Sequence, residues 1–270
     1  MLKFYNFQDV IGVEGIINTK WQDFNVYTYL VDGMLIDTGS KSMKNKLLPY
    51  YKSSSFSLVV LTHHHEDHTG NAAWIQKELN VPIYIHPLGV DICSKPINYP
   101  EYRQNIWGCR EPFIAQPLGQ SISSESYEWK VIYTPGHAED HVSLLNEETG
   151  QIFTGDLFVS PKTKLIMTQE SIPNIIESLR KLLTYDFQEV FCSHYGYISQ
   201  GKIMLKRKLD YLENISAEII YLHNHGYSIE EISQKLFPKN YPIITFSEGE
   251  WNSFNIIRSV LMLKNSSLKF

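Results

Sequence analysis

The stretch Leu61–Asn71, LTHHHEDHTGN, crowds four histidines and two carboxylates directly behind the apolar run FSLVV. Neutral imidazole and carboxylate are ligands that suit zinc, and iron and manganese accept them too. If the loop leaves a strand here, the one-residue spacing of His63 and His65 lets both rings point the same way, while Asp67 and His68 follow round the turn. The pattern therefore predicts a metal site, although this stretch alone is also compatible with a solvated polar loop. The side chains expected to face away are His64 and Glu66.

Three further candidate ligands each lie beside an apolar strand that ends in a turn. They are His137 in YTPGHAEDH, Asp156 in IFTGDLF and His194 in FCSHYG. Together with the His63–His68 loop, this makes four strand ends that each carry a candidate ligand, a number that seldom arises by chance. The three motifs therefore favour a metal site over the solvated loop.

The ordered set of motifs resembles the metallo-β-lactamase-fold hydrolases, on the glyoxalase II-like side of that superfamily. The HxHxDH signature of that family falls on His63, His65, Asp67 and His68. The later family positions fall on the PGH histidine His137, the GD aspartate Asp156 and the late histidine His194. Upstream, LIDTGS resembles the early strand-end aspartate of the family, here Asp37. The match spans roughly residues 10–200.

The resemblance implies an α+β fold, a four-layer αβ/βα sandwich with two divalent metal ions at one edge. It assigns the first ion to His63, His65 and His137, and the second to Asp67, His68 and His194, with Asp156 as the bridge. Zinc is the favoured metal, and iron or manganese remain open because the same ligands accept them. Two such ions can share a water and lower its pKa, which makes a bridging hydroxide the expected nucleophile. Asp67 is expected to be catalytic as well, by orienting that hydroxide.

Several neighbouring residues have two possible roles. Asp37 is expected to bond a ligand imidazole or loop amides, because an outer carboxylate fixes ring orientation, and a strand-ending turn is its alternative. His141, four residues after His137, is a second outer or structural candidate. Tyr195 can polarise a substrate oxygen as a catalytic residue or pack beside a strand end. Cys192 is expected to fill the core.

Strands and helices alternate through the first two thirds of the chain. The strands expected are NVYTYLV and MLIDTGS, joined at Asp32-Gly33, then FSLVVLT, VPIYIH, WKVIYT, HVSLLN, QIFTGD and EVFCSH. The helices expected among them are Lys41–Tyr50, Ala72–Leu79 and Ile172–Leu183. These elements form a predicted catalytic domain over residues 1–200, and residues 87–128 read as an irregular insertion near the site.

The pattern of apolar residues in the sequence changes after Gly201. Apolar residues then recur at three- and four-residue steps as far as Leu222, which predicts one amphipathic helix ended near Gly226. Shorter helices are expected over Ile229–Leu236 and Trp251–Lys264. Residues 201–270 therefore form a predicted helical extension.

The start of that long helix carries a basic cluster close behind His194 in sequence. It can hold an anionic substrate group, or it is simply a solvated helix face. Its members are Lys202, Lys206, Arg207 and Lys208. The aromatic residues of the insertion can roof an apolar pocket for a small molecule, or they can bury a homodimer contact. These aromatic residues are Tyr99, Tyr102, Trp107 and Phe113.

The composition and charge of the chain limit its possible partners and cellular location. The 270 residues are 43% hydrophobic with a net charge of -5, so the chain can bury a core but shows no overall basic footprint for nucleic acid. Three distant cysteines without a CxxC pair fit a reducing compartment. No secretion signal and no apolar run of membrane-spanning length is visible. The cytoplasm is the expected location.

The leading functional hypothesis is a metal-dependent hydrolase of a small ester, thioester or lactone. The alternatives are a metal-dependent phosphodiesterase or ribonuclease, and a non-hydrolytic di-iron protein on the same fold. The resemblance disfavours the di-iron oxidoreductases, which carry glutamate where His65 stands, and the antibiotic β-lactamases, which generally lack the Asp156 carboxylate. The helical extension departs from the glyoxalase II pattern, which argues against S-lactoylglutathione as the substrate.

Overall fold

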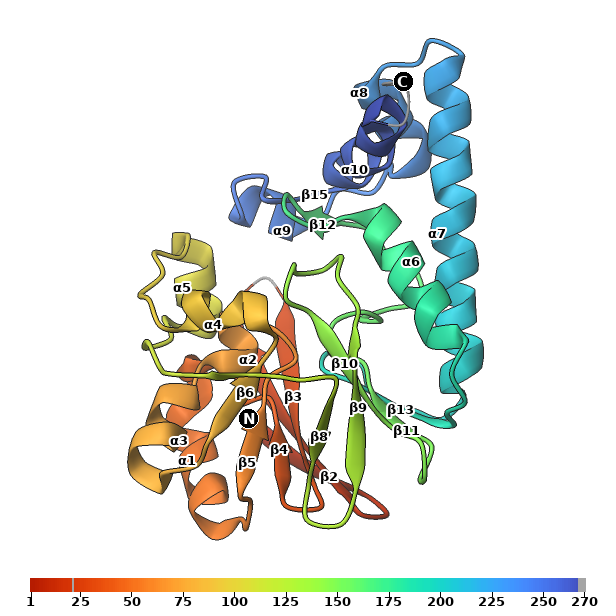
Figure 1. Cartoon of the computed structure of the whole chain (residues 1–270). Helices are drawn as coiled ribbons and strands as arrows, with labels where there is room; N and C mark the ends of the chain where they lie inside the picture. The colour runs from red at the N-terminus through yellow and green to blue at the C-terminus, as the bar shows by residue number, and fades with distance from the viewer. Residues whose placement is uncertain (21, 267–270) are drawn as a thin grey trace.

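The computed structural model describes residues 1–20 and 22–266, and two mixed β-sheets form its centre (Figure 1). The first sheet has seven strands in the order β1-β2-β3-β4-β5-β6-β7. Their bounds are β1 Leu2–Phe7, β2 Val10–Asn18, β3 Asp23–Val31, β4 Met34–Ile36, β5 Leu58–Val60, β6 Ile83–Ile85 and β7 Gln116–Pro117. β4 and β5 run parallel, so both point their carboxyl ends toward the same edge.

The second sheet has six strands in the order β14-β13-β11-β10-β9-β8. Their bounds are β8 Ser121–Ser123, β9 Glu128–Tyr133, β10 Val142–Asn146, β11 Gln151–Phe153, β13 Glu189–Cys192 and β14 Gly196–Ile198. β10 is antiparallel to both β9 and β11, and β11 is parallel to β13. The carboxyl ends of β9, β11 and β13 therefore meet at one edge.

Strand alternation divides the apolar side chains among three cores. On β3, Tyr29 and Val31 join the core between the sheets, while Leu30 joins the core under the helices on the first sheet. On β10, Leu144 faces the core between the sheets and Leu145 faces the helices on the second sheet. Successive side chains of a strand point to opposite faces, so each strand stabilises two layers.

Helices cover the outer face of each sheet. Around the first sheet lie η1 Lys41–Met43, α1 Lys44–Ser53, α2 Glu66–Thr69 and α3 Ala72–Leu79. On the second sheet lie α6 Ile172–Leu183 and α7 Gly201–Asn224, which share a buried core with its strands. This arrangement confirms the predicted four-layer sandwich (Figure 1).

The segment 87–128 is more regular than predicted. It contains α4 Pro87–Cys93 and α5 Glu101–Trp107 as well as β7 and β8. The His86 ring caps α4 by accepting a hydrogen bond from the Leu88 amide at 3.3 Å, and Pro87 at the first helical turn favours the start of a helix. The prediction of an irregular insertion is wrong for these helices, because each is too short for a 3.6-residue period to be visible.

The C-terminal region is helical, as predicted, and contacts the rest of the chain. It continues after α7 with α8 Ile229–Leu236, α9 Pro242–Phe246, β15 Trp251–Asn252 and α10 Ser253–Ser266. Ser228 and Glu231 form a capping box at the start of α8. β15, which the sequence placed in a helix, instead pairs with β12 Ile166–Met167. Within residues 1–20 and 22–266, no helix is both long and apolar enough to cross a membrane.

Candidate metal centre

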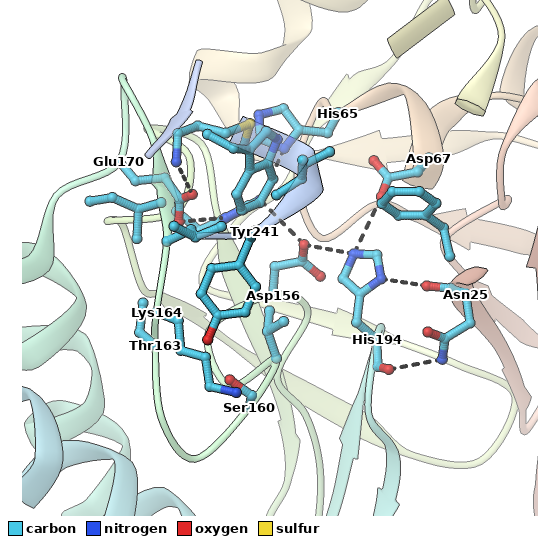
Figure 2. Close-up of a pocket in the computed structure, with 18 of the residues that line it drawn as sticks. Asn25, His65, Asp67, Asp156, Ser160, Thr163, Lys164, Glu170, His194 and Tyr241 are labelled. Atoms are coloured by element: carbon cyan, nitrogen blue, oxygen red, sulfur yellow. Dashed lines mark hydrogen bonds and ion pairs between the residues drawn. The ribbon is translucent and has the colours of Figure 1, made fainter. Parts of the chain in front are cut away.

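The seven predicted ligands all follow the carboxyl ends of strands that run in the same direction within their sheet. The HxHxDH loop follows β5, His137 follows β9, Asp156 follows β11 and His194 follows β13. In open α/β sheets such ends form the usual crevice for a ligand. The structure brings the seven side chains together there, between the two sheets. Figure 2 shows four of them, His65, Asp67, Asp156 and His194.

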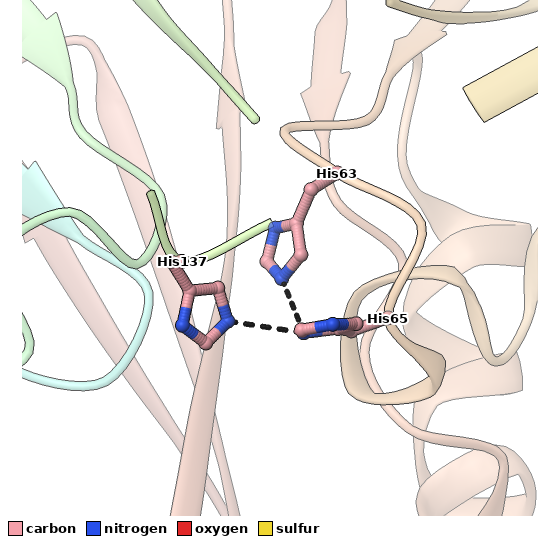
Figure 3. Close-up of side chains that lie close together, drawn as sticks. All are labelled: His63, His65 and His137. Atoms are coloured by element: carbon pink, nitrogen blue, oxygen red, sulfur yellow. Dashed lines mark hydrogen bonds between the residues drawn. The ribbon is translucent and has the colours of Figure 1, made fainter. Parts of the chain in front are cut away.

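Three imidazoles converge at one end of this cluster (Figure 3). His65 Nδ1 lies 3.0 Å from His63 Nε2 and 3.0 Å from His137 Nε2. One ring nitrogen can donate to only one of two neighbours, so hydrogen bonds alone leave a lone pair facing a lone pair. A cation between the three nitrogens satisfies all of them at once.

A second group forms around the two aspartates. Asp67 Oδ2 lies 3.3 Å from His194 Nε2 and 3.5 Å from His68 Nε2. Asp156 lies between the two groups, because its Oδ2 is 3.0 Å from His194 Nε2 and 3.3 Å from His137 Nε2. Asp156 is therefore placed where a bridging ligand would stand.

Two buried polar atoms of this cluster have no hydrogen-bond partner among the described residues. They are His68 Nε2 and Asp156 Oδ1, which lie 3.5 Å apart. Burying such atoms unsatisfied costs about 1–3 kcal/mol each. Cations held by the same nitrogen and oxygen donors would remove that cost, so the residues present fit a pair of metal ions.

Three of the imidazoles donate their outer nitrogen to a fixed acceptor. His68 Nδ1 contacts Asp37 Oδ2 at 2.7 Å, His137 Nδ1 contacts Glu170 Oε2 at 3.0 Å, and His194 Nδ1 contacts the Asn25 carbonyl at 2.6 Å. Each donation requires hydrogen on Nδ1, so that Nε2 is the nitrogen that faces the cluster and has the lone pair whenever the ring is neutral. The three rings are thus held in the tautomer that binds a cation.

Asp37 lies where the sequence placed it, against a ligand imidazole and a loop amide. Besides His68, it accepts a hydrogen bond from the Thr62 amide at 2.8 Å and one from the Thr62 hydroxyl. Its φ of 58° puts a non-glycine residue in the left-handed region. Such strain persists only where the surroundings hold it, which fits a positioning role for the carboxylate.

We expect Asp37→Asn to lower metal affinity by about 10- to 100-fold, the usual effect of losing an outer carboxylate that orients a histidine ligand. Competition with a fluorescent zinc chelator measures this. Asp32→Asn is the matched control. Asp32, at the β3–β4 turn, also has positive φ and accepts hydrogen bonds, but its donors are Ser124 and Ser126, not a ligand imidazole. Equal affinities in the Asp37 variant and the control would contradict the assignment.

His141 supports the backbone of Asp156. Its Nε2 accepts a hydrogen bond from the Asp156 amide at 3.0 Å, and its Nδ1 donates to the Thr134 carbonyl at 3.0 Å. Burial, assisted by the neighbouring His137 ring, lowers the pKa of His141 to about 3, so the ring is neutral. A Cβ at Gly155 would lie 2.6 Å from His141 Nε2, and φ there is +49°, so the turn requires glycine.

The buried rings and carboxylates of the cluster shift one another's pKa values. Burial lowers the pKa of His68, but the carboxylates of Asp67 and Asp156 outweigh burial and hold it well above the usual value. Burial likewise raises the pKa of Asp156, and the His194 and His68 rings reverse this to well below the usual value. Protons on the rings thus compensate the carboxylates, and metal ions would have to displace them.

Sequence reasoning missed the side chains that hold the ligand loops from outside. Glu170 accepts from His137 and also from the Met167 amide at 2.8 Å. Glu66, expected to face away from the metals, does so and forms a buried bidentate pair with Arg103 at 2.6 and 2.7 Å. No local motif marks either residue, because their partners lie far away in the sequence.

A cavity of about 680 Å³ opens onto the cluster and is lined by His65, Asp67, His137, Asp156 and His194. Its other walls come from the start of β3, from α5, from residues 159–167 and from the C-terminal region (Figure 2). Of the predicted aromatic roof, Tyr102 and Trp107 line the cavity, while Phe113 packs in the core beside the first sheet. Tyr99 is buried and is not among the described lining residues.

The predicted substrate-binding cations do not reach this cavity. Lys202 donates to the Tyr185 carbonyl at 3.0 Å, Lys206 pairs with Asp210, and Arg207 contacts the Met204 sulfur. None of the three is among the described lining residues. Their predicted position is corrected, because all three lie on the outer faces of α7.

Lys208 of the same predicted cluster does line the cavity. It stands three residues after Leu205 and four before Leu212, two buried leucines, so the helical period puts all three on one face. That spacing is a signal that could have singled it out from the sequence.

Tyr195 and Cys192 complete the predicted set. Tyr195 is 46% exposed, packs edge-on against Phe158 at 5.2 Å, and is not among the described residues that line the cavity. Its position therefore argues against contact with a substrate. Cys192 is buried in the core of the second sheet, which is the role expected for it.

Comparison with known proteins gives a consistent match. The family model described as Metallo-beta-lactamase superfamily matches residues 21–194. The Probable metallo-hydrolase YqjP of Bacillus subtilis is 24% identical over 89% of this chain and 90% of its own length. An Atrochrysone carboxyl ACP thioesterase of Passalora fulva is 25% identical over 69% of this chain, which spans 52% of that relative.

Solved structures share the same architecture. A metallo-beta-lactamase family protein from Thermus thermophilus, TTHA1429, superposes with a TM-score of 0.68 at 18% identity, covering 96% of this chain and 95% of the other. TTHA1623, solved in a di-iron-bound form, is 25% identical with a TM-score of 0.54, covering 69% of this chain and 94% of the other.

Proposed function

Because this chain belongs to the metallo-beta-lactamase superfamily, we propose that it is a dinuclear metallo-hydrolase that cleaves a small ester, thioester or lactone. The observation that carries the proposal is the convergence of seven ligand-type side chains around two buried atoms that have no partner among the described residues. Cations bound among these side chains would give both buried atoms a partner.

We propose zinc for both positions, with iron as the alternative because the similar protein TTHA1623 was solved with two irons. His63, His65 and His137 would hold one ion, Asp67, His68 and His194 the other, and Asp156 would contact both. When bound, two such ions lower the pKa of a water and stabilise the negative charge that develops on an ester carbonyl oxygen.

The side chains supply orientation around that chemistry. Asp67 lines the cavity, and the nearby rings of His68 and His194 keep its pKa well below the usual value against the effect of burial. The carboxylate is therefore ionised and can accept a hydrogen bond from an attacking solvent molecule, which fixes the direction of attack. Asp37, Glu170 and the Asn25 carbonyl hold three rings in place around it.

The cavity supports a small substrate. Its volume of about 680 Å³ lies within the usual range for small-molecule sites, and Ile106, Trp107, Leu165 and Trp251 give it apolar walls. A relative that is a carboxyl ACP thioesterase supports a thioester as one member of the class. The net charge of -5 gives no support to a nucleic-acid substrate.

A substrate panel tests the proposal. We expect the zinc-loaded protein to hydrolyse at least one of a 4-nitrophenyl ester, an acyl thioester and a lactone, and to lose this activity when stripped with chelator and regain it with zinc. Bis-4-nitrophenyl phosphate is the fourth substrate. Metal-dependent turnover confined to the phosphodiester would contradict the proposed class, and turnover unaffected by metal removal would contradict the mechanism.

A further inference from the structure

Lys208 is a buried cation on the wall of the cavity. Its side chain comes from α7, the residue is 3% exposed, and Nζ donates to the Phe158 carbonyl. Among the described residues, no carboxylate lies within 4.0 Å of Nζ. Burial lowers the pKa of Lys208 to about 8, so the amine is still mostly protonated at pH 7.

A buried ammonium group that no carboxylate contacts is unfavourable, and it normally acquires a partner. The carboxylates of Glu170 and Asp156 act on Lys208 only from a distance, and both contact ligand histidines instead. An ammonium group has three N–H donors, and the one hydrogen bond described for Lys208 uses a single donor. The other buried cation of the cavity wall, Arg103, already has Glu66 as its partner. Lys208 is thus the buried positive charge that a bound anion could compensate.

We propose that Lys208 recognises a carboxylate on the substrate, so that the enzyme acts on acidic esters or thioesters. The inference rests on the proposed function and further specifies that the substrate is negatively charged. One ammonium group matches the single charge of a carboxylate. A phosphate carries close to two charges, but of the other cations that line the cavity Arg103 is paired with Glu66, and Lys162 and Lys164 are exposed to solvent.

A purely structural role for Lys208 makes a different prediction. The segment 158–164, of which residues 159–164 line the cavity, is tied to α7 at two points. Lys208 donates to the Phe158 carbonyl, and the Tyr211 hydroxyl donates to the Thr163 carbonyl at 2.9 Å. Between them, Val159 has φ of 49°, a strained value for a β-branched residue. If Lys208 only anchored this segment, loss of either tie would have a similar effect.

The test compares Lys208→Met with Tyr211→Phe in the zinc-loaded protein. The probes are 4-nitrophenyl hydrogen succinate, which carries a carboxylate, and its neutral methyl ester. We expect Lys208→Met to lower the ratio of kcat/KM for the acidic over the neutral ester by about 10- to 100-fold, mostly through KM, as for the loss of a charged hydrogen bond. Tyr211→Phe should leave the ratio unchanged, and Lys208→Arg should restore part of it.

A second measurement separates this inference from the proposed hydrolase. Calorimetry measures the binding of succinate to the zinc-loaded wild-type and Lys208→Met proteins. Any binding of succinate to the metal ions is the same in both proteins, so a difference in affinity reports the contribution of Lys208. Weaker succinate binding in the variant supports the anion site, whether or not the esters are hydrolysed. Absence of hydrolysis for both esters would contradict only the proposed hydrolase. Equal succinate binding, an unchanged ester ratio, or an equal effect of Tyr211→Phe overturns the role of Lys208. A larger loss for inorganic phosphate than for succinate overturns the choice of carboxylate.

Discussion

Asp156→Asn protein purified without chelator is expected to carry about one metal ion per chain, against close to two in the wild type. The carboxylate lies between the two groups of ligands, 3.0 Å from His194 and 3.3 Å from His137, so its loss removes a donor from both. Metal ions supply several kcal/mol of transition-state stabilisation, so hydrolytic turnover should fall on the order of 10³-fold. Elemental analysis by mass spectrometry and steady-state assays measure the two effects.

Asp140→Asn is the matched control for this variant. Asp140 is also a buried aspartate of the ligand region, but its carboxylate accepts from His64 at 2.7 Å and belongs to none of the described groups of metal-ligand atoms. The amide oxygen of asparagine can still accept that bond, so the control should keep both ions. Two ions per chain in both variants would refute the bridging role of Asp156, and a metal-free, fully folded wild type would refute the metal centre itself.

The largest effect on stability is expected from Arg103→Met. Arg103 is 9% exposed and Glu66 is 0% exposed, and two short hydrogen bonds join them. Removing the guanidinium leaves the Glu66 carboxylate buried without a counter-charge, which typically costs about 3–5 kcal/mol. For a chain of this size we expect Tm to fall by roughly 6–20 °C, measured by calorimetry at fixed zinc concentration.

Two further variants test whether the fall in Tm comes from the unpaired charge of Glu66. Adding Glu66→Gln to Arg103→Met removes the stranded carboxylate, so the double variant should regain part of the lost Tm. Lys130→Met breaks an ion pair of similar length, 2.6 Å to Glu147, but both side chains are largely exposed, so Tm should not change. A double variant less stable than Arg103→Met alone would contradict this explanation.

The Arg103 pair also connects three parts of the molecule. Arg103 lies on α5, Glu66 lies between the ligands His65 and Asp67, and a second carboxylate, Glu250, lies 3.4 Å from the same guanidinium. Glu250 belongs to the C-terminal region, next to the β15 strand that pairs with β12. The metal loop, the cavity roof and the C-terminal region are therefore linked through one side chain.

Much of the fold follows from local patterns. Helices such as Ile172–Leu183 and Ile229–Leu236 have the predicted bounds, because a long apolar stripe or a capping box marks them. The short helices α4 and α5 were missed, since seven residues make only two turns and leave no readable period. The strand β15 was taken for helix because only its pairing with β12 makes it a strand.

The sequence by itself determined which groups can bind metal, because each ligand lies in a short motif and the donor atoms follow from residue type. It also placed every motif at the end of a strand. The tertiary structure decided which acceptor holds each ring, with the Asn25 carbonyl on His194 and Glu170 on His137. It also decided that Lys208, rather than Lys202 or Lys206, faces the cavity. The physical reason is that a hydrogen bond or a cavity wall joins residues distant in the chain, and only the packing of sheets and helices brings them within reach.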